Sequence, residues 1–389
     1  MLPMVARDTD EEHRAATPLE LLFDLCFVVA IALAAASLHH AIAEDHIGQG
    51  LLGFTMVFFA IWWAWMNFTW FASSYDTDDA AYRLTTLVQM AGVLVLAAGV
   101  PSFFEDGNFS LGWVGYVLMR LAMITQWLRA ARANPDRRRC ALRYAAGIFA
   151  CQIYWVLLVV VPPERVWMVF AVGILAELAV PVWAERAEPT TWHPHHIAER
   201  YGLFTIIVLG ESILAATTAM QEAIGAGHAP GQLASLAAAG LVIVFAMWWL
   251  YFSVPAHNVL TTMRTAFAWG YGHVVIFGSA AAVGAGLQVA VDYHTGATQL
   301  GPLAAGMATA VPVAGYLFSV WVLQIRVCME VHGMLMTMAF PAAAVLVLAS
   351  PFTGAPIHVT AVVLAVLVAI AVVTSRKHTA AELEPGARS

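Results

Sequence analysis

Apolar runs of about twenty residues alternate with short polar or turn-rich breaks along the chain, and this pattern predicts twelve membrane-spanning helices. The predicted spans begin near residues 18, 51, 82, 109, 140, 165, 199, 231, 263, 303, 327 and 357. The breaks between them are too short to hold a soluble domain. We therefore expect an all-α, polytopic membrane protein whose chemistry lies in or at the bilayer.

The composition supports this fold class and excludes several others. Of 389 residues, 61% are hydrophobic and 11% charged, and the mean hydropathy is +0.76. The net charge of −7 provides no basic surface, so nucleic acid is not an expected partner. The four cysteines are scattered without metal-type spacing, and no nucleotide-binding glycine loop occurs, so neither a metal nor a cofactor is predicted.

Positive charges predict the orientation in the membrane. With the N-terminus inside, sixteen of the eighteen Lys and Arg fall on the cytoplasmic side. Arg165 falls outside and Arg120 lies within the fourth span. Residues 1–16 are acidic and lack a cleavage pattern, so we expect no removable signal peptide. The prediction is a multi-pass protein of the bacterial inner (plasma) membrane with both termini cytoplasmic.

An internal repeat is indicated when the chain is compared with itself. Residues 62–68 in the second span resemble 248–254 in the eighth, and the next span in each half opens with an arginine, Arg83 and Arg264. An even number of spans per half makes the two halves parallel. We predict two parallel six-helix repeats. The expected segments are an N-terminal tail (1–16), the first repeat (17–184), a linker (185–198), the second repeat (199–375) and a C-terminal tail (376–389).

The first span carries two carboxylates in an otherwise apolar helix. Glu20 and Asp24 are four residues apart and so share one helical face. Carboxylates inside a span are costly unless they face protein, a partner charge or water, so this face is predicted to point inward. For Glu20, a position at the headgroup level near the helix N-terminus is the alternative.

Other polar residues are predicted at the same cytoplasmic level. Depth along the helices places them in two clusters, one per repeat: Asn67, Arg83 and Gln89 with Asp24 in the first, and Glu199, Arg200 and His273 in the second. The clusters suggest a vestibule or cytoplasmic gate. The alternative is snorkelling and aromatic-belt residues that fix helix height, and this is the interpretation adopted for the tryptophans.

Three further charges lie near the membrane midplane. These are Arg120 in the fourth span, Glu177 in the sixth and Glu211 in the seventh. A buried Arg120 requires a carboxylate partner, and Glu177 or Glu211 is nearest in depth. Such a pair can be a structural lock between helices or part of a proton pathway.

Two polar segments resemble metal sites but have simpler explanations. His193, His195 and His196 lie within four residues, yet a second set of ligands is missing, so helix capping and pairing with Glu199 are favoured. Residues 75–79 resemble part of a calcium loop without its glycine and distal glutamate. Here Asp78 and Asp79 are expected to cap the third span and neutralise Arg83.

Three motifs together carry a family resemblance. They are ELLFDLCFV at residues 20–28, YDTD at 75–78 followed by Arg83, and ERYGLFTIIVLGES at 199–212. The chain resembles the bacterial low temperature requirement A (LtrA) family from residue 17 to about 375, which implies an inner-membrane protein but supplies no substrate or catalytic residue. A weaker resemblance, through residues 22–24, is to endolysosomal potassium channels, but the second repeat has no Asp at the matching place.

The duplication and the midplane charges favour transport. The first hypothesis is a secondary, proton-coupled transporter of a small solute or ion, with Asp24, Glu211 and Arg120 as principal polar residues. A cation channel built on the same repeats is the second hypothesis. A membrane-embedded enzyme or lipid-binding protein with His273 and the carboxylates as acid and base is the third. The sequence does not predict the substrate, the coupling ion or the oligomeric state.

Overall fold

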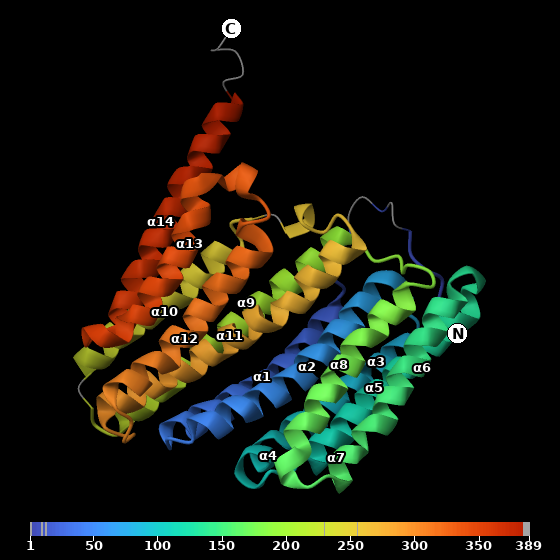
Figure 1. The fold of residues 1–389 in the computed structure, drawn as a ribbon, viewed down its shortest axis with the longest axis horizontal. Coiled ribbons are helices and arrows are strands. Elements are labelled where there is room, and N and C mark those ends of the chain that lie inside the picture. The colour runs from blue at the N-terminus through green and yellow to red at the C-terminus, as the bar shows by residue number, and fades with distance from the viewer. Residues whose placement is uncertain (1, 9–10, 12–13, 229, 255, 384–389) are drawn as a thin grey trace. The chain divides into compact units, whose positions relative to one another are not determined.

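The computed structural model describes residues 2–8, 11, 14–228, 230–254 and 256–383. In this part of the chain the fold contains helices and no strand, as expected (Figure 1). Twelve long helices lie at the twelve predicted positions, and two short helices follow α3 and α6. Clustering of contacts divides the chain into unit 1, residues 1–34 and 55–201, and unit 2, residues 35–54 and 202–389.

Unit 1 is built mainly from the first eight helices. Their bounds are α1 Pro18–Ala43, α2 Ile47–Tyr75, α3 Ala80–Ala98, α4 Val100–Asp106, α5 Ser110–Ala133, α6 Arg138–Trp155, α7 Leu157–Val160 and α8 Val166–Glu185. Helices α3, α5, α6 and α8 pack in that order. The α3–α5 pair approaches closely because Gly92 and Gly115 lie where a Cβ atom would meet the opposite helix.

Unit 2 holds the remaining helices, the end of α1 and the start of α2. Their bounds are α9 Pro194–Gly225, α10 Pro230–Tyr251, α11 Met263–Thr295, α12 Pro302–Val320, α13 Met329–Ala349 and α14 Pro356–Leu383. Residues 194–201 of α9 belong to unit 1. Within unit 2, α11 packs on α12, α12 on α13, α13 on α14 and α14 on α10.

Local signals explain where the helices begin and end. Five of the long helices, α1, α9, α10, α12 and α14, begin at a proline, whose fixed φ suits the first helical turn. Asp79 caps α3 by accepting a hydrogen bond from the backbone N–H of Tyr82. Gly107 and Gly296 end α4 and α11 with positive φ, a conformation that favours glycine.

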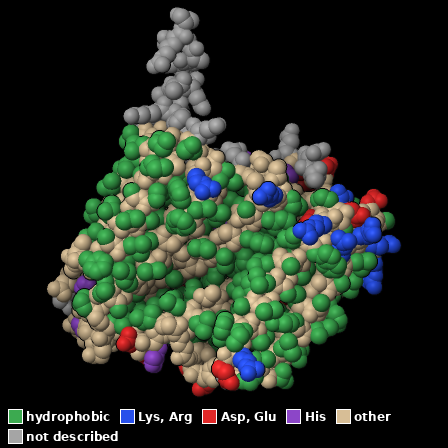
Figure 2. All heavy atoms as spheres, viewed as in Figure 1, with side chains coloured by type: hydrophobic (Ala, Val, Ile, Leu, Met, Phe, Trp, Pro, Cys, Tyr) green, Lys and Arg blue, Asp and Glu red, His purple; other side chains and the backbone are tan. Residues whose placement is uncertain are grey.

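Ten helical segments in the described residues are long and apolar enough to cross a membrane. The two long helices outside this group, α5 and α6, are less apolar because they carry arginines and glutamines, among them Arg120 and Gln126 in α5. Figure 2 shows hydrophobic side chains over most of the visible face. Leu175, Val345 and Val362 are 67%, 66% and 63% exposed. Such a surface is that of a multi-pass membrane protein.

Candidate functional site

Helices α1 and α9 bring four ionisable side chains together in the interior of unit 1. Glu20 and Asp24 lie one turn apart on α1, and His196 and Arg200 lie one turn apart on α9. All four side chains are 0% exposed. We call these four residues the buried tetrad.

Arg200 is the centre of the buried tetrad. Its Nη1 lies 2.8 Å from Oε1 of Glu20, and its Nη2 donates to Oδ1 of Asp24 at 2.5 Å. Nε2 of His196 lies 3.0 Å from Oε1 of Glu20. Trp65 on α2 donates its indole N–H to Oδ1 of Asp24 at 2.7 Å. One guanidinium therefore bridges both carboxylates and ties α9 to α1.

The charges of the buried tetrad do not balance. Two carboxylates and one guanidinium give a net charge of −1 while the imidazole of His196 is neutral. Oδ2 of Asp24 and Nδ1 of His196 have no hydrogen-bond partner among the described residues. The tetrad becomes neutral when it holds one additional proton. Either of these two atoms can accept that proton without giving up an existing hydrogen bond.

A second pair of opposite charges, Arg14 and Asp76, lies near the tetrad. Arg14, which is 4% exposed, donates to the backbone oxygens of Ala72 and Ser73 and lies 3.6 Å from Asp76. This arginine and aspartate sum to zero. Burial raises the pKa of Asp76 above its usual range, and Glu20 adds to the shift. Arg14 attracts Glu20 as well as Asp76, so it offsets part of the negative charge of the tetrad.

Aromatic rings enclose the buried tetrad. The Trp65 ring packs edge-on against Tyr201, with the ring centroids 4.9 Å apart, and Tyr201 accepts a hydrogen bond from the indole N–H of Trp70 at 3.0 Å. Phe23 stacks on Phe27 and Phe68. This shell makes the surroundings of the four charges apolar, which strengthens their electrostatic interactions.

A second buried centre in unit 1 surrounds Glu177 on α8. Arg120 on α5 donates to Oε2 at 2.6 Å, and Trp63 donates to the same oxygen at 2.9 Å. Tyr116, Trp155 and Gln152 donate to Oε1 at 3.0, 3.1 and 3.5 Å. The prediction that Arg120 pairs with Glu177 or Glu211 is confirmed, and Glu177 is the partner. One cation and four neutral donors on three other helices hold this carboxylate in place.

The structure does not bring the other predicted residues of unit 1 into these centres. Arg83 is 58% exposed and binds Asp78 through two hydrogen bonds of 2.7 Å, so the expected convergence with Asp24 is wrong. The short loop before α3 places Asp78 within reach of Arg83, and this local pair keeps the arginine outside. Asn67 donates to the backbone oxygen of Trp63 one turn earlier, and Gln89 is buried on α3.

Glu199, Glu211 and His273 are not members of the buried tetrad. Glu199 is partly exposed on α9, although it is the neighbour of Arg200. Glu211 and His273 belong to unit 2, where Glu211 is partly exposed. His273 is buried, and its ring nitrogens contact the backbone oxygen of Trp269 at 2.7 Å and the Tyr251 hydroxyl at 3.0 Å. Glu211 is therefore not the partner of Arg120.

His196 and two tryptophans are site residues whose roles the sequence analysis did not identify. His196 faces Glu20 rather than the expected Glu199, because the helix–helix contact decides its partner. Trp63 and Trp65 are fully buried donors to Glu177 and Asp24 and not residues of an aromatic belt. The four-residue spacing of His196 and Arg200, equal to that of Glu20 and Asp24, is the signal that could have revealed the tetrad.

Groups of three or more His, Cys, Asp or Glu side chains placed to hold a metal ion do not occur in the described ranges. The tetrad, with two carboxylates, one imidazole and a guanidinium between them, is suited instead to binding a proton. Its arginine already occupies the position between the carboxylates that a metal would take.

Comparison with known proteins places the chain in a family. The model of the bacterial low temperature requirement A protein (LtrA) family matches residues 15–373. An uncharacterized protein of Rhizobium meliloti (strain 1021) is 28% identical over 310 residues, which cover 75% of this chain and 73% of the relative. The matched segment includes both buried centres, the first eleven long helices and α14 as far as residue 373. The chain therefore belongs to the bacterial low temperature requirement A (LtrA) family.

Proposed function

We propose that this protein is a secondary transporter in which the buried tetrad binds and releases one proton as a small solute or ion crosses the membrane. The observation that carries the proposal is the charge imbalance of the tetrad: two fully buried carboxylates face one arginine. An unbalanced charge in a membrane interior costs from about 2.5 kcal/mol upwards. A bound proton removes this cost, so the tetrad has a reason to take up a proton and a means of releasing it.

Proton binding also has a mechanical consequence in unit 1. When Asp24 is ionised, Arg200 holds both carboxylates of α1 and fixes α9 against it. When Asp24 carries the proton, its attraction to Arg200 weakens and Glu20 keeps the remaining ion pair. The contact between α1 and residues 194–201 of α9 can then loosen. A change of this kind is what couples a proton to alternating access.

The location in the cell and the topology belong to the same proposal. We infer a bacterial inner membrane with both termini cytoplasmic, supported by the asymmetry of Lys and Arg along the chain. The arrangement as two parallel six-helix repeats, residues 17–184 and 199–375, is retained as part of it. In such a transporter the two repeats would form the two halves of the molecule, and Glu20 and Asp24 of the proton site would belong to the first repeat.

The test is flux in proteoliposomes that contain the full chain, with a panel of small solutes and an imposed pH gradient. Wild-type protein should show solute flux that depends on the gradient. Asp24→Asn preserves size and most hydrogen bonds and leaves the tetrad neutral without a proton, so it should fold normally and lose the pH dependence. Glu211→Gln, a matched removal of a carboxylate in α9, should retain it.

Three results would contradict the proposal. Asp24→Asn with the wild-type pH profile would show that the tetrad is a structural lock. Loss of pH dependence in Glu211→Gln alone would assign the coupling to Glu211. A current of K⁺ or Na⁺ that is independent of the pH gradient would favour the cation channel, in which a monovalent cation replaces the proton as the neutralising charge.

A further inference from the structure

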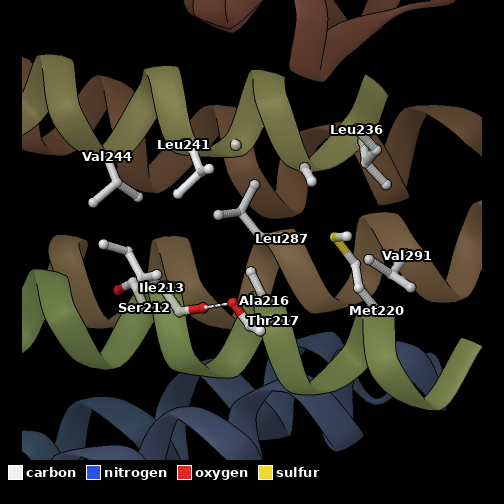
Figure 3. A pocket seen from close by; sticks show the side chains of 12 residues that line it. Ser212, Ile213, Ala216, Thr217, Met220, Leu236, Leu241, Val244, Leu287 and Val291 are labelled. Carbon is white, nitrogen blue, oxygen red and sulfur yellow. Dashed lines mark hydrogen bonds between the residues drawn. The ribbon is translucent and has the colours of Figure 1, made fainter. Parts of the chain in front are cut away.

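Unit 2 contains an elongated cavity between α9, α10 and α11, with a volume of about 240 Å³. Figure 3 shows Leu236, Leu241 and Val244 of α10 across the cavity from side chains of α9, with Leu287 of α11 between them. The cavity runs along α9 from Ser212 to beyond Ala216, ending near Met220. All twelve lining residues belong to helical segments able to cross a membrane.

The residues that line the cavity offer few hydrogen-bond partners to a water molecule. Ten of the twelve residues are apolar or glycine, and the two hydroxyl groups already donate within the protein. Ser212 donates to the backbone oxygen of Ala280 at 2.9 Å, and Thr217 donates to that of Ile213 at 2.8 Å. A buried water needs two to four polar partners, whereas an apolar occupant needs none. The cavity therefore suits hydrocarbon.

The dimensions suit one extended alkyl chain. Ser212 and Met220 are eight residues apart, which is about 12 Å along a helix. The volume of about 240 Å³ divided by this length gives a cross-section of about 20 Å², that of a single chain and narrower than a fused ring system. Leu241 is 39% exposed and Thr217 is also exposed, so the cavity is open along its side rather than sealed.

Polar side chains at one end indicate which molecule supplies the chain. Leu236 lies at the Met220 end of the cavity, and on α10 the exposed Ser235 directly precedes it, with the exposed Gln232 one turn before it. The hydroxyl group of Ser235 lies 2.8 Å from Nε2 of His358. Half of the hydrocarbon core of a bilayer is about 15 Å thick, close to the length of the cavity. We propose that this cavity binds one acyl chain of a membrane phospholipid, with the headgroup beside Gln232 and Ser235 and the chain end near Ser212.

The site would make a lipid part of unit 2, because the acyl chain would fill the gap between α9 and α10. This inference is independent of the proposed proton coupling, since none of the tetrad residues contacts the cavity. Each methylene of the occupant that a larger side chain displaces should weaken binding about four-fold.

The experiment is photolabelling in vesicles of phosphatidylethanolamine and phosphatidylglycerol that contain the full chain. Two phosphatidylethanolamine probes carry a diazirine, one near the chain end and one near the ester. The chain-end probe should label peptides around Ser212 and Val244, and the ester-end probe those around Met220 and Leu236. Both should exceed the labelling of Val362, a 63% exposed residue of α14.

Cavity-filling variants give the specific control. Ala216→Leu and Ala237→Leu place larger side chains in the cavity on two different helices and should each lower the labelling several-fold. Ala238→Leu, on the exposed face beside Ala237, should leave it unchanged. Thermal unfolding of each variant identifies any that fails to fold. Labelling equal to that of Val362, identical patterns from the two probes, or stronger labelling by a free diazirine fatty acid would each overturn the assignment to a phospholipid.

Discussion

Substitution of Arg120 and Glu177, singly and together, tests whether their buried ion pair stabilises the fold. Both side chains are at most 1% exposed. Arg120→Met leaves the carboxylate with its four neutral donors but without its cation, and breaking a buried pair in this way typically costs about 3–5 kcal/mol. Glu177→Gln instead strands the arginine, whose Nε and Nη1 already lack hydrogen-bond partners in the described structure, and should cost about the same.

The double variant Arg120→Met with Glu177→Gln removes both charges. Its loss of stability should be well below the sum of about 6–10 kcal/mol for the two single changes, because no unpaired charge remains. Reversible unfolding in mixed micelles can be followed by tryptophan fluorescence, since Trp63 and Trp155 both contact Glu177.

Arg83→Ala is the matched control, because its pair with Asp78 lies on the surface. It should leave the unfolding curve unchanged. Additive losses in the double variant, or single variants as stable as the wild type, would refute the reasoning that Arg120 and Glu177 stabilise the fold as a buried pair.

Two further predictions concern the loop ends of unit 1. Burial opposes ionisation of Asp79, but hydrogen bonds from Tyr82 and Arg129 outweigh this effect and lower the pKa of Asp79 in the folded protein. Ionised Asp79 therefore stabilises the fold fully above the ordinary aspartate pKa of about 3.9. This stabilisation is lost as the pH falls through the lower pKa of the folded protein. Asp79→Asn should flatten the acid end of a stability–pH curve, and an unchanged curve would contradict this. Single cysteines at Arg138 and Asp106 in a cysteine-free chain should react with impermeant reagents from opposite sides of the membrane, and labelling of both from the periplasm would overturn the topology.

The sequence predicted the helices well because their limits depend on local signals. Twelve apolar runs, prolines at helix starts and Asp79 as a cap are all readable without tertiary information. The Arg120–Glu177 pair was also within reach, since a buried arginine needs a carboxylate at the same depth. The depth of a residue in the membrane follows from its position along the helix. Depth reduced the possible partners of Arg120 to two carboxylates, Glu177 and Glu211.

The rotation of each helix was harder to predict. Lipid and protein interior are both apolar, so a membrane helix shows little difference between its faces. Trp63 and Trp65 therefore resembled belt residues, although their indole N–H groups donate to carboxylates on α8 and α1. His196 had a local candidate partner in Glu199, and only the packing of α9 on α1 shows that Glu20 is its partner. The predicted pairing of Arg83 with Asp78 is confirmed, whereas its predicted place beside Asp24, inferred from depth alone, is wrong.

The central claim is that the buried tetrad holds one exchangeable proton, and infrared difference spectroscopy over a pH titration measures this directly. Wild-type protein should show the gain and loss of one carboxyl or imidazole proton per chain that is absent from Asp24→Asn. The signal should persist in Asp292→Asn, which removes a carboxylate of unit 2 that pairs with His39. Identical difference spectra for the wild type and Asp24→Asn would contradict the account.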